Sequence, residues 1–208
     1  MDTTKLAVAI FDKLADLYQE KYMAVDLYHD SLDLFCDRLP IDAHILELAC
    51  GPGNITQYLL KKRPDLRILG IDLAPNMLAL AKLNNPTAEF KLMDCRDIHQ
   101  LDQQYAAIMA GFCLPYLSKE EAVQLISHAA ALLKPEGILY LSTMEGDYSQ
   151  SGFQSASTGD QMYMHYHQAD YLTVALQEIG FKILEIRHQP YPTQDGSKVT
   201  DLIIIATC

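Results

Sequence analysis

The residues best suited to chemistry in this chain are two glycines that follow a short apolar run. Gly51 and Gly53 come directly after Ile45–Leu48, and glycine lets the main chain adopt left-handed angles and approach a ligand closely. A helix is predicted from about Asn54 to Lys62, so its free amides and positive dipole end would face that ligand. Such a turn suits the polar part of a nucleoside cofactor.

Asp72 is predicted to bind the ribose of this cofactor. It ends a second apolar segment, residues 67–72, about one helix and one strand after the glycine turn. At the tip of the neighbouring parallel strand, a carboxylate can accept hydrogen bonds from both ribose hydroxyls. Leu73 and Met77 are then expected to pack around the adenosine. The alternative is that Asp72 only caps the helix that Pro75 would open.

Two cofactor classes compete for the glycine turn. A dinucleotide fingerprint requires G-x-G-x-x-G, and Thr56 occupies its third glycine position here. The segment from Glu47 to Gly53 instead resembles the acidic-x-Gly-x-Gly-x-Gly motif of the class I S-adenosylmethionine-dependent methyltransferases, with Ala49 in place of the first glycine. That resemblance implies an S-adenosylmethionine site formed by Glu47, Ala49, Gly51, Gly53 and Asn54, in which a methyl group at position 49 still fits.

The resemblance continues after the next two predicted strands. Asp94 follows the strand predicted at 88–93, where the family often has an aspartate that accepts from the adenine amine. A backbone amide of Cys95 or Arg96 would then meet a ring nitrogen. Gly111, which follows the strand predicted at 105–110, is expected on the cofactor side. The family commonly has an aspartate near the start of that strand, where this chain has alanine.

Residues 3–39 are predicted to form two amphipathic helices, because apolar side chains recur there at spacings of three and four. The segment from Phe11 to Tyr18 is similar to a helix that many small-molecule methyltransferases place over cofactor and substrate. The resemblance implies that residues 1–40 form a lid from which Tyr18 and Tyr22 reach the cofactor. The alternative is that these helices only cover one edge of the core.

The domain predicted at 41–208 contains an irregular segment at 145–167, which we interpret as a substrate-side insert. Its two nearby histidines are the candidates for a general base, and no other catalytic residue is identified. They lack a third ligand at a metal-binding spacing, so no metal is expected. The candidate substrate-binding residues are Phe112, Tyr116, Tyr163, His165 and His167.

The order of elements predicts an α/β fold: a Rossmann-like, seven-stranded and mostly parallel sheet with helices on both faces. The strands predicted at 181–187 and 198–206 are joined by a loop too short for a parallel crossover, so the chain should end in an antiparallel hairpin. This ending is typical of the methyltransferase arrangement, whereas nicotinamide-binding domains usually end with a parallel strand.

The net charge, the hydropathy and the cysteine content make several classes of function less plausible. The chain has 208 residues and a formal net charge of −11, which disfavours binding to nucleic acid phosphates. No apolar run is long enough to cross a bilayer, and five scattered cysteines suggest the cytoplasm. We therefore predict in-line methyl transfer from S-adenosylmethionine to a small polar molecule, with the oligomeric state open. The alternatives are a non-catalytic protein that binds the cofactor or its product S-adenosylhomocysteine, and an NAD(P)-dependent oxidoreductase.

Overall fold

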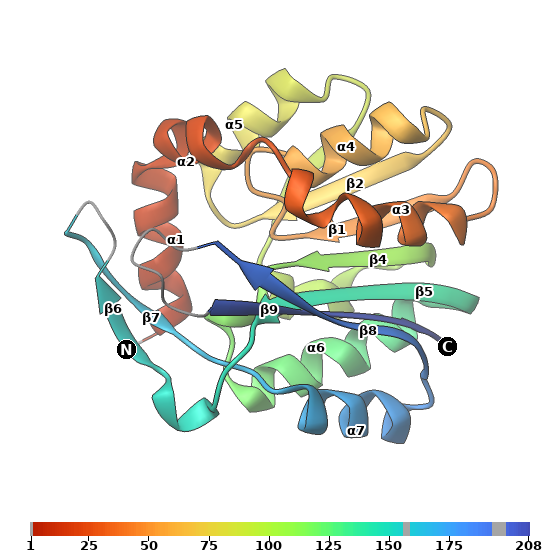
Figure 1. Ribbon diagram of the computed structural model, residues 1–208. Coiled ribbons are helices and arrows are strands. Elements are labelled where there is room, and N and C mark those ends of the chain that lie inside the picture. Colours follow the sequence, from red (N-terminus) through yellow and green to blue (C-terminus); the bar gives the residue numbers. More distant parts are fainter. Residues whose placement is uncertain (1, 156–158, 193–198) are drawn as a thin grey trace.

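A seven-stranded sheet in the order β3-β2-β1-β4-β5-β9-β8 forms the centre of the computed structural model, which describes residues 2–155, 159–192 and 199–208 (Figure 1). The first five strands are parallel, and β9 lies antiparallel between β5 and β8. This confirms the predicted fold class and the terminal hairpin. The strands are β1 (His44–Leu48), β2 (Arg67–Asp72), β3 (Glu89–Leu92), β4 (Tyr105–Gly111), β5 (Leu133–Met144), β8 (Lys182–Tyr191) and β9 (Val199–Thr207).

Helices cover both faces of this sheet, because its strands are apolar on both sides. Figure 1 shows α3 (His29–Asp37), α4 (Asn54–Lys62) and α5 (Pro75–Asn84) on one face, with α6 (Lys119–Leu132) and α7 (Ala169–Ile179) on the other. Two separate cores result, one containing Phe35 and Tyr140 and the other containing Ile108. A 3-10 helix, η2 (Cys95–Gln100), packs beside α6.

The helices begin and end at residues whose chemistry fixes those positions. Ser118 and Glu121 form both hydrogen bonds of a capping box at the start of α6. Pro75 occupies the first turn of α5, where its missing N–H costs nothing. Gly180 ends α7 with a φ of 107°, in the left-handed region that glycine adopts readily.

The N-terminal segment differs from its prediction, because its first helix is broken at Leu14. The segment forms α1 (Thr3–Lys13), α2 (Ala15–Tyr22) and the 3-10 helix η1 (Asp26–Tyr28) before α3. The bend lets the rings of Phe11 and Tyr18 meet edge to face at 5.6 Å. Figure 1 shows α1 lying across the end of the sheet toward which the parallel strands point.

The predicted insert is more regular than expected. It contains the 3-10 helix η4 (Tyr148–Gln150) and a two-stranded antiparallel hairpin, β6 (Gly152–Ser155) and β7 (Gln161–Met164). Strands this short give too few alternations for the sequence pattern to reveal them. The hairpin packs on α1, and another 3-10 helix, η3 (Leu114–Tyr116), follows β4. None of the helices in the described ranges combines the length and apolar character that a bilayer crossing requires.

Candidate cofactor site

A cavity lies where the parallel strands end and α1 crosses them. Its mainly apolar lining, with a few polar groups, is typical of a small-molecule site. Most of the predicted cofactor residues line it, together with two of the predicted substrate residues. The predicted residues in its walls are Tyr18, Ala49, Gly51, Asp72, Leu73, Met77, Asp94, Cys95, Gly111, Phe112 and Tyr116.

Sequence reasoning missed the contribution of α1 to this cavity. Thr4, Ala7 and Val8 line it beside Phe11, and their spacing of three and four residues places them on one face of the helix. Thr4 also donates a hydrogen bond of 2.8 Å to the carbonyl of Tyr116, so α1 is joined to the opposite wall. The helical periodicity was visible in the sequence, but the partner of that helical face was not.

The glycine turn owes its shape to three residues at every second position, 49, 51 and 53, which all have left-handed backbone conformations. Gly51 and Gly53 have φ values of 55° and 77°, and Ala49 has a φ of 49°. A residue with a Cβ costs roughly 1–2 kcal/mol in this region. The expectation that a methyl group fits at position 49 overlooked this backbone strain, which explains why a glycine is preferred there.

Asp72 bonds to the backbone at the start of α5, one of the two roles that the sequence left as alternatives, and it also lies in the cavity wall, where ribose binding stays a prediction. Its Oδ1 accepts from the amide of Ala74 at the start of α5, and its Oδ2 accepts from the amide of Gly51 at 2.8 Å. The carboxylate therefore holds the glycine turn against β2. Two oxygens offer about four lone-pair sites, so acceptors remain for ribose hydroxyls. Burial raises the pKa of this carboxyl, while the backbone amides lower it.

Glu47 is not in the cavity wall, and the structure gives it a different position from the predicted one. Its side chain is only 1% exposed, and its Oε2 accepts from the Thr56 hydroxyl at 2.5 Å. The backbone amide of Thr56 also interacts with this carboxyl. The bond to the Thr56 hydroxyl joins β1 to the first turn of α4. Glu47 positions the turn without contacting the cavity.

We expect Glu47→Gln to change how stability depends on pH. Burial raises the pKa of Glu47 from 4.5 to about 7, so its contribution to stability is complete below the unfolded pKa. That contribution is lost as pH rises through 7, because ionisation then requires a buried charge. Relative to the native protein, Glu47→Gln should therefore gain up to about 3 kcal/mol between pH 5 and pH 8.

Urea unfolding of both proteins at the two pH values measures this effect. Glu178→Gln, on the exposed face of α7, is the matched control that removes a carboxylate from solvent. A pH dependence shared by all three proteins would show that Glu47 stays ionised throughout this range.

The side chain of Arg96, beside the predicted adenine site, bonds to neighbouring carboxylates. The Arg96 guanidinium holds both carboxylate oxygens of Asp94, with Nη2 donating to Oδ2 at 2.7 Å. It also contacts Asp2 and Glu121. The Arg96 amide also donates to the Asp94 carboxylate. Cys95 is the first residue of η2, so its amide has no acceptor within that helix. Adenine recognition by Asp94 stays a prediction.

Of the predicted cofactor residues Tyr18, Tyr22 and Asn54, only Tyr18 lines the cavity. Burial strongly raises the pKa of the Tyr18 hydroxyl. Tyr22 is 4.7 Å from Tyr18 between ring centroids but is not itself in the wall. The Asn54 side chain donates to the Tyr22 carbonyl at 3.0 Å. Asn54 therefore joins the end of α2 to the glycine turn, where the sequence had predicted a direct cofactor contact.

The structure does not bring the two candidate histidines to the cavity. His167 is fully buried, with its ring nitrogens bonded to the Leu114 carbonyl and the Tyr171 hydroxyl. Burial lowers its pKa to about 4. His165 contacts the Tyr148 hydroxyl at 3.2 Å, and the ring of Tyr163 packs on it at 4.8 Å. These side chains anchor the insert to η3. Within the described ranges, no group of three His, Cys, Asp or Glu residues could hold a metal ion.

The cavity lies at the carboxyl ends of β1, β2 and β4, in a sheet that ends with an antiparallel hairpin, which is the arrangement expected of a methyltransferase. Comparison with known proteins agrees. Residues 45–137 match the family model described as a methyltransferase domain. Residues 45–137 of this chain therefore resemble the class I S-adenosylmethionine-dependent methyltransferases, and S-adenosylmethionine is the cofactor that this resemblance gives to the cavity.

Two kinds of relatives illustrate the similarity. The trans-aconitate 2-methyltransferase of Variovorax paradoxus is 37% identical over 101 residues, which cover 49% of this chain and 38% of that enzyme. The chain thus spans less than half the length of the curated relatives it matches.

Solved structures show the same fold over nearly the whole chain. A complex of DhpI with SAH has a TM-score of 0.76 and 17% identity, covering 99% of this chain and 96% of that one. The 1,6-didemethyltoxoflavin-N1-methyltransferase of Burkholderia thailandensis, solved with its substrate and S-adenosylhomocysteine, has a TM-score of 0.73 and 17% identity, with coverages of 98% and 87%.

Proposed function

We propose that this protein transfers a methyl group from S-adenosylmethionine to a small molecule. The observation that carries the proposal is the Asp72 carboxylate, which is bonded to the Gly51 amide and lies in the wall of the cavity. That geometry puts the ribose acceptor and the main chain of the glycine turn next to each other. The named substrates of the relatives, trans-aconitate and 1,6-didemethyltoxoflavin, support a small acceptor.

The chemistry asks little of the protein beyond placement. The sulfonium already makes the methyl group electrophilic, so the site must align the acceptor in line with the breaking bond and exclude water. The cavity is suited to this, because α1 closes it and aromatic rings form much of its outer wall. Phe11 contacts both Tyr18 and Tyr116 across that wall, at 5.6 Å and 5.1 Å between ring centroids.

The experiment that tests turnover is a transfer screen with S-adenosylmethionine carrying a labelled methyl group, offered together with pools of small metabolites. Labelled product that depends on the protein supports the proposal. Binding of S-adenosylmethionine without transfer to any pool would favour the non-catalytic alternative, since a fold and a cofactor site do not guarantee catalysis. An NAD(P)-dependent oxidoreductase is disfavoured by the family resemblance and by the hairpin.

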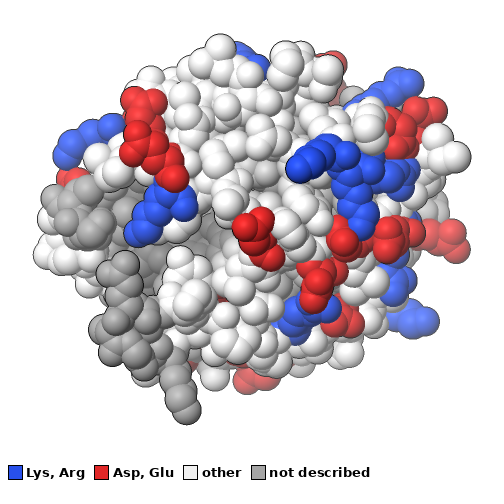
Figure 2. Space-filling view, turned by 45° about the horizontal axis from the view of Figure 1, so that its top comes forward, with Lys and Arg blue, Asp and Glu red and all other residues white. Residues whose placement is uncertain are grey.

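A small acceptor also agrees with the charge on the surface. On the face that Figure 2 presents, Lys and Arg side chains are mostly next to Asp and Glu side chains, and the one group of adjoining basic side chains is bordered by acidic ones. Together with the net charge of −11, this supports a protein without a nucleic acid partner.

We further propose that the lid consists of α1 and α2 and not of all residues in 1–40. Helix α3 belongs to the core, because Leu32, Phe35 and Cys36 are at most 1% exposed. The packing below α1 is a small separate cluster around Ala15 and Met77. Polar contacts hold its ends, including the Asp12 carboxylate, which accepts from the Asn76 amide at 2.7 Å, and the ion pair of Lys13 with Asp160 at 3.0 Å.

Hydrogen exchange tests this division of the N-terminal segment. Amides of residues 3–22 should exchange quickly in the free protein and markedly more slowly with S-adenosylhomocysteine, because lids are among the less stable segments of a fold. Amides of α3 should be slow in both states and serve as the internal control. Slow exchange of residues 3–22 without ligand, unaltered on its addition, would show that α1 and α2 are a permanent part of the core.

A further inference from the structure

A buried carboxylate, Asp201, is connected to the cavity wall through the ring of Tyr28, which packs on Phe112. Asp201 directly precedes the apolar residues 202–206 of β9, and its side chain is only 3% exposed. Its Oδ2 accepts from the Tyr28 hydroxyl at 2.7 Å. Among the residues that the structure describes, no lysine or arginine forms an ion pair with it. A buried carboxylate without a cation costs several kcal/mol, and among the described residues the hydrogen bond of Tyr28 is the compensation that the structure shows.

The position of this pair is on the acceptor side of the cofactor. The Tyr28 ring packs at 5.2 Å on Phe112, which follows β4 and lines the cavity. Asp201 pairs with Met144 at the carboxyl end of β5. Because Asp72 places the ribose over β2 and the glycine turn follows β1, the sulfonium end of the cofactor should extend toward β4 and β5.

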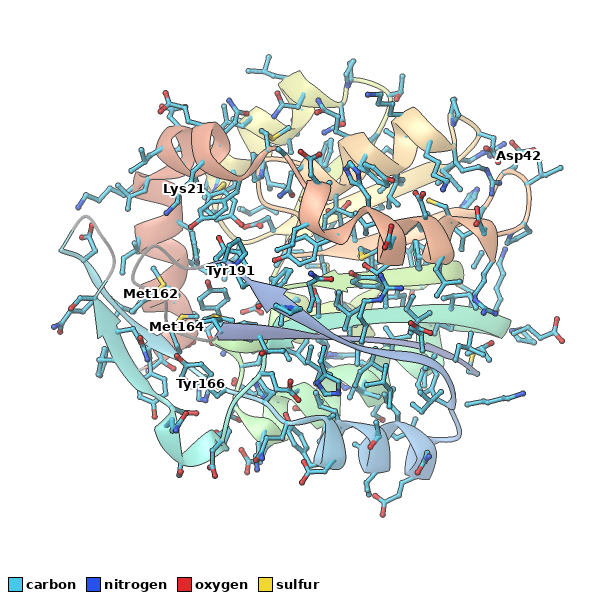
Figure 3. The ribbon with its side chains drawn as sticks, in the orientation of Figure 1. Lys21, Asp42, Met162, Met164, Tyr166 and Tyr191 are labelled. Carbon is cyan, nitrogen blue, oxygen red and sulfur yellow. The ribbon has the colours of Figure 1, made fainter. Side chains whose placement is uncertain are left out.

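The surroundings of that end are aromatic. Figure 3 shows Tyr191, at the end of β8, near the same end of the sheet as Met162 and Met164 of β7, with α1 and α2 beyond them. An acceptor beside Phe112 would meet the ring faces of Phe112 and Tyr28.

The cavity wall offers nothing that would hold an anionic acceptor. Of its carboxylates, Asp94 is paired with Arg96 and Asp72 accepts from two backbone amides, and no Lys or Arg is among the described residues that line the cavity. Lys21 lies outside the wall with its ammonium 5.0 Å from the centre of the Tyr22 ring. Aromatic faces combined with carboxylates attract ammonium groups. An acceptor with several carboxylates would meet like charge and would find no guanidinium to hold it.

We propose that the methyl acceptor is a primary or secondary amine whose ammonium group is bound beside Asp201 and Tyr28. This inference rests on the proposed methyltransferase function and adds the class of its substrate. The ammonium gives one proton to the Asp201 carboxylate, and the freed nitrogen lone pair attacks the methyl carbon. The new N–CH3 bond forms as the S–CH3 bond breaks, which leaves a methylated ammonium and neutral S-adenosylhomocysteine. Asp201 then passes its proton to solvent.

The test compares acceptors that differ only in their charged group. A panel of amines and the carboxylates of the same skeletons, phenethylamine and 3-phenylpropanoate among them, is offered with labelled S-adenosylmethionine. Calorimetry on the S-adenosylhomocysteine complex measures binding of the same compounds without turnover. The expected result is binding and methylation among the amines and neither among the carboxylates.

Variants test the assignment of the residues. Asp201→Asn should lower amine kcat/KM and amine affinity at least tenfold while S-adenosylhomocysteine affinity changes less than twofold. Tyr28→Phe keeps the carboxylate and should retain the preference for amines. Asp102→Asn, in an exposed loop, is the control and should behave as the native protein. Comparison of the acceptors on the native protein needs no variant, so it stands even if Asp201→Asn unfolds.

Preference for carboxylates, absence of any amine binding to the S-adenosylhomocysteine complex, or an unaffected Asp201→Asn enzyme would each overturn the inference while leaving the methyltransferase function intact. A folded native protein that binds neither S-adenosylmethionine nor S-adenosylhomocysteine would instead remove the proposed function, and this inference with it.

Discussion

Asp72→Ala should weaken S-adenosylhomocysteine binding by a hundredfold or more. The change removes acceptors for two ribose hydroxyls, and charge-assisted hydrogen bonds contribute roughly 1.5–3 kcal/mol each. It also releases the Gly51 amide, which donates to Asp72 Oδ2 at 2.8 Å, so the glycine turn loses the group that holds it against β2. Isothermal calorimetry on protein whose fold is confirmed by circular dichroism measures the change.

Asp72→Asn is the matched control for this prediction. It preserves the shape and one acceptor oxygen, so it should lose about tenfold, the equivalent of about 1.4 kcal/mol. If Asp72→Ala binds S-adenosylhomocysteine within threefold of the native protein, Asp72 serves only as a cap and the ribose lies elsewhere.

Gly53→Ala should destabilise the fold by about 3 kcal/mol or more, a cost expected of overpacking combined with backbone strain. An added Cβ at Gly53 would lie 2.3 Å from Nδ2 of Asn85, at a φ of 77°. Asn85 is 3% exposed and donates to the Gly53 carbonyl at 2.9 Å, so it has little room to retreat. Chemical unfolding gives the free energy.

Gly51→Ala separates the two causes, because it lies in the same turn with a similar φ of 55° but open space around the added Cβ. The nearest atom is Cε1 of Tyr18 at 3.9 Å, so only strain of roughly 1–2 kcal/mol is expected. In an Asn85→Ala background, Gly53→Ala should cost about as little, since the clash is then absent. Equal costs for the two glycine variants in the native background would contradict the packing explanation.

Local sequence patterns predicted most of the fold. The apolar runs gave β2 as residues 67–72, and the glycine turn with its following polar segment gave α4 as residues 54–62, both as the structure has them. Pro75 marked the start of a helix because its effect is local. The antiparallel hairpin followed from the short loop between its strands. Each of these features depends on residues that are neighbours in the chain.

What the sequence could not predict depends on contacts between distant segments. Tyr28 and Asp201 meet across most of the chain, and Arg96 joins Asp2 to Asp94 and Glu121. No periodicity reports such pairs. The histidines of the insert show the same limit. A spacing of two residues places His165 and His167 on one face of an extended segment, but it does not show whether that face packs on the cavity or on η3. Glu47 was predicted to contact the cofactor, but its contact with Thr56 and not with the cavity is a property of the packed fold.

Calorimetric titration of the native protein with S-adenosylhomocysteine, S-adenosylmethionine and NADH tests the central claim most directly. The account predicts saturable binding of the first two, and stabilisation by about 2.7 kcal/mol at 100 times the dissociation constant. NADH should give no heat of binding and no thermal protection. A folded protein that binds neither adenosyl ligand, or that binds NADH in their place, would contradict the assignment of the cavity.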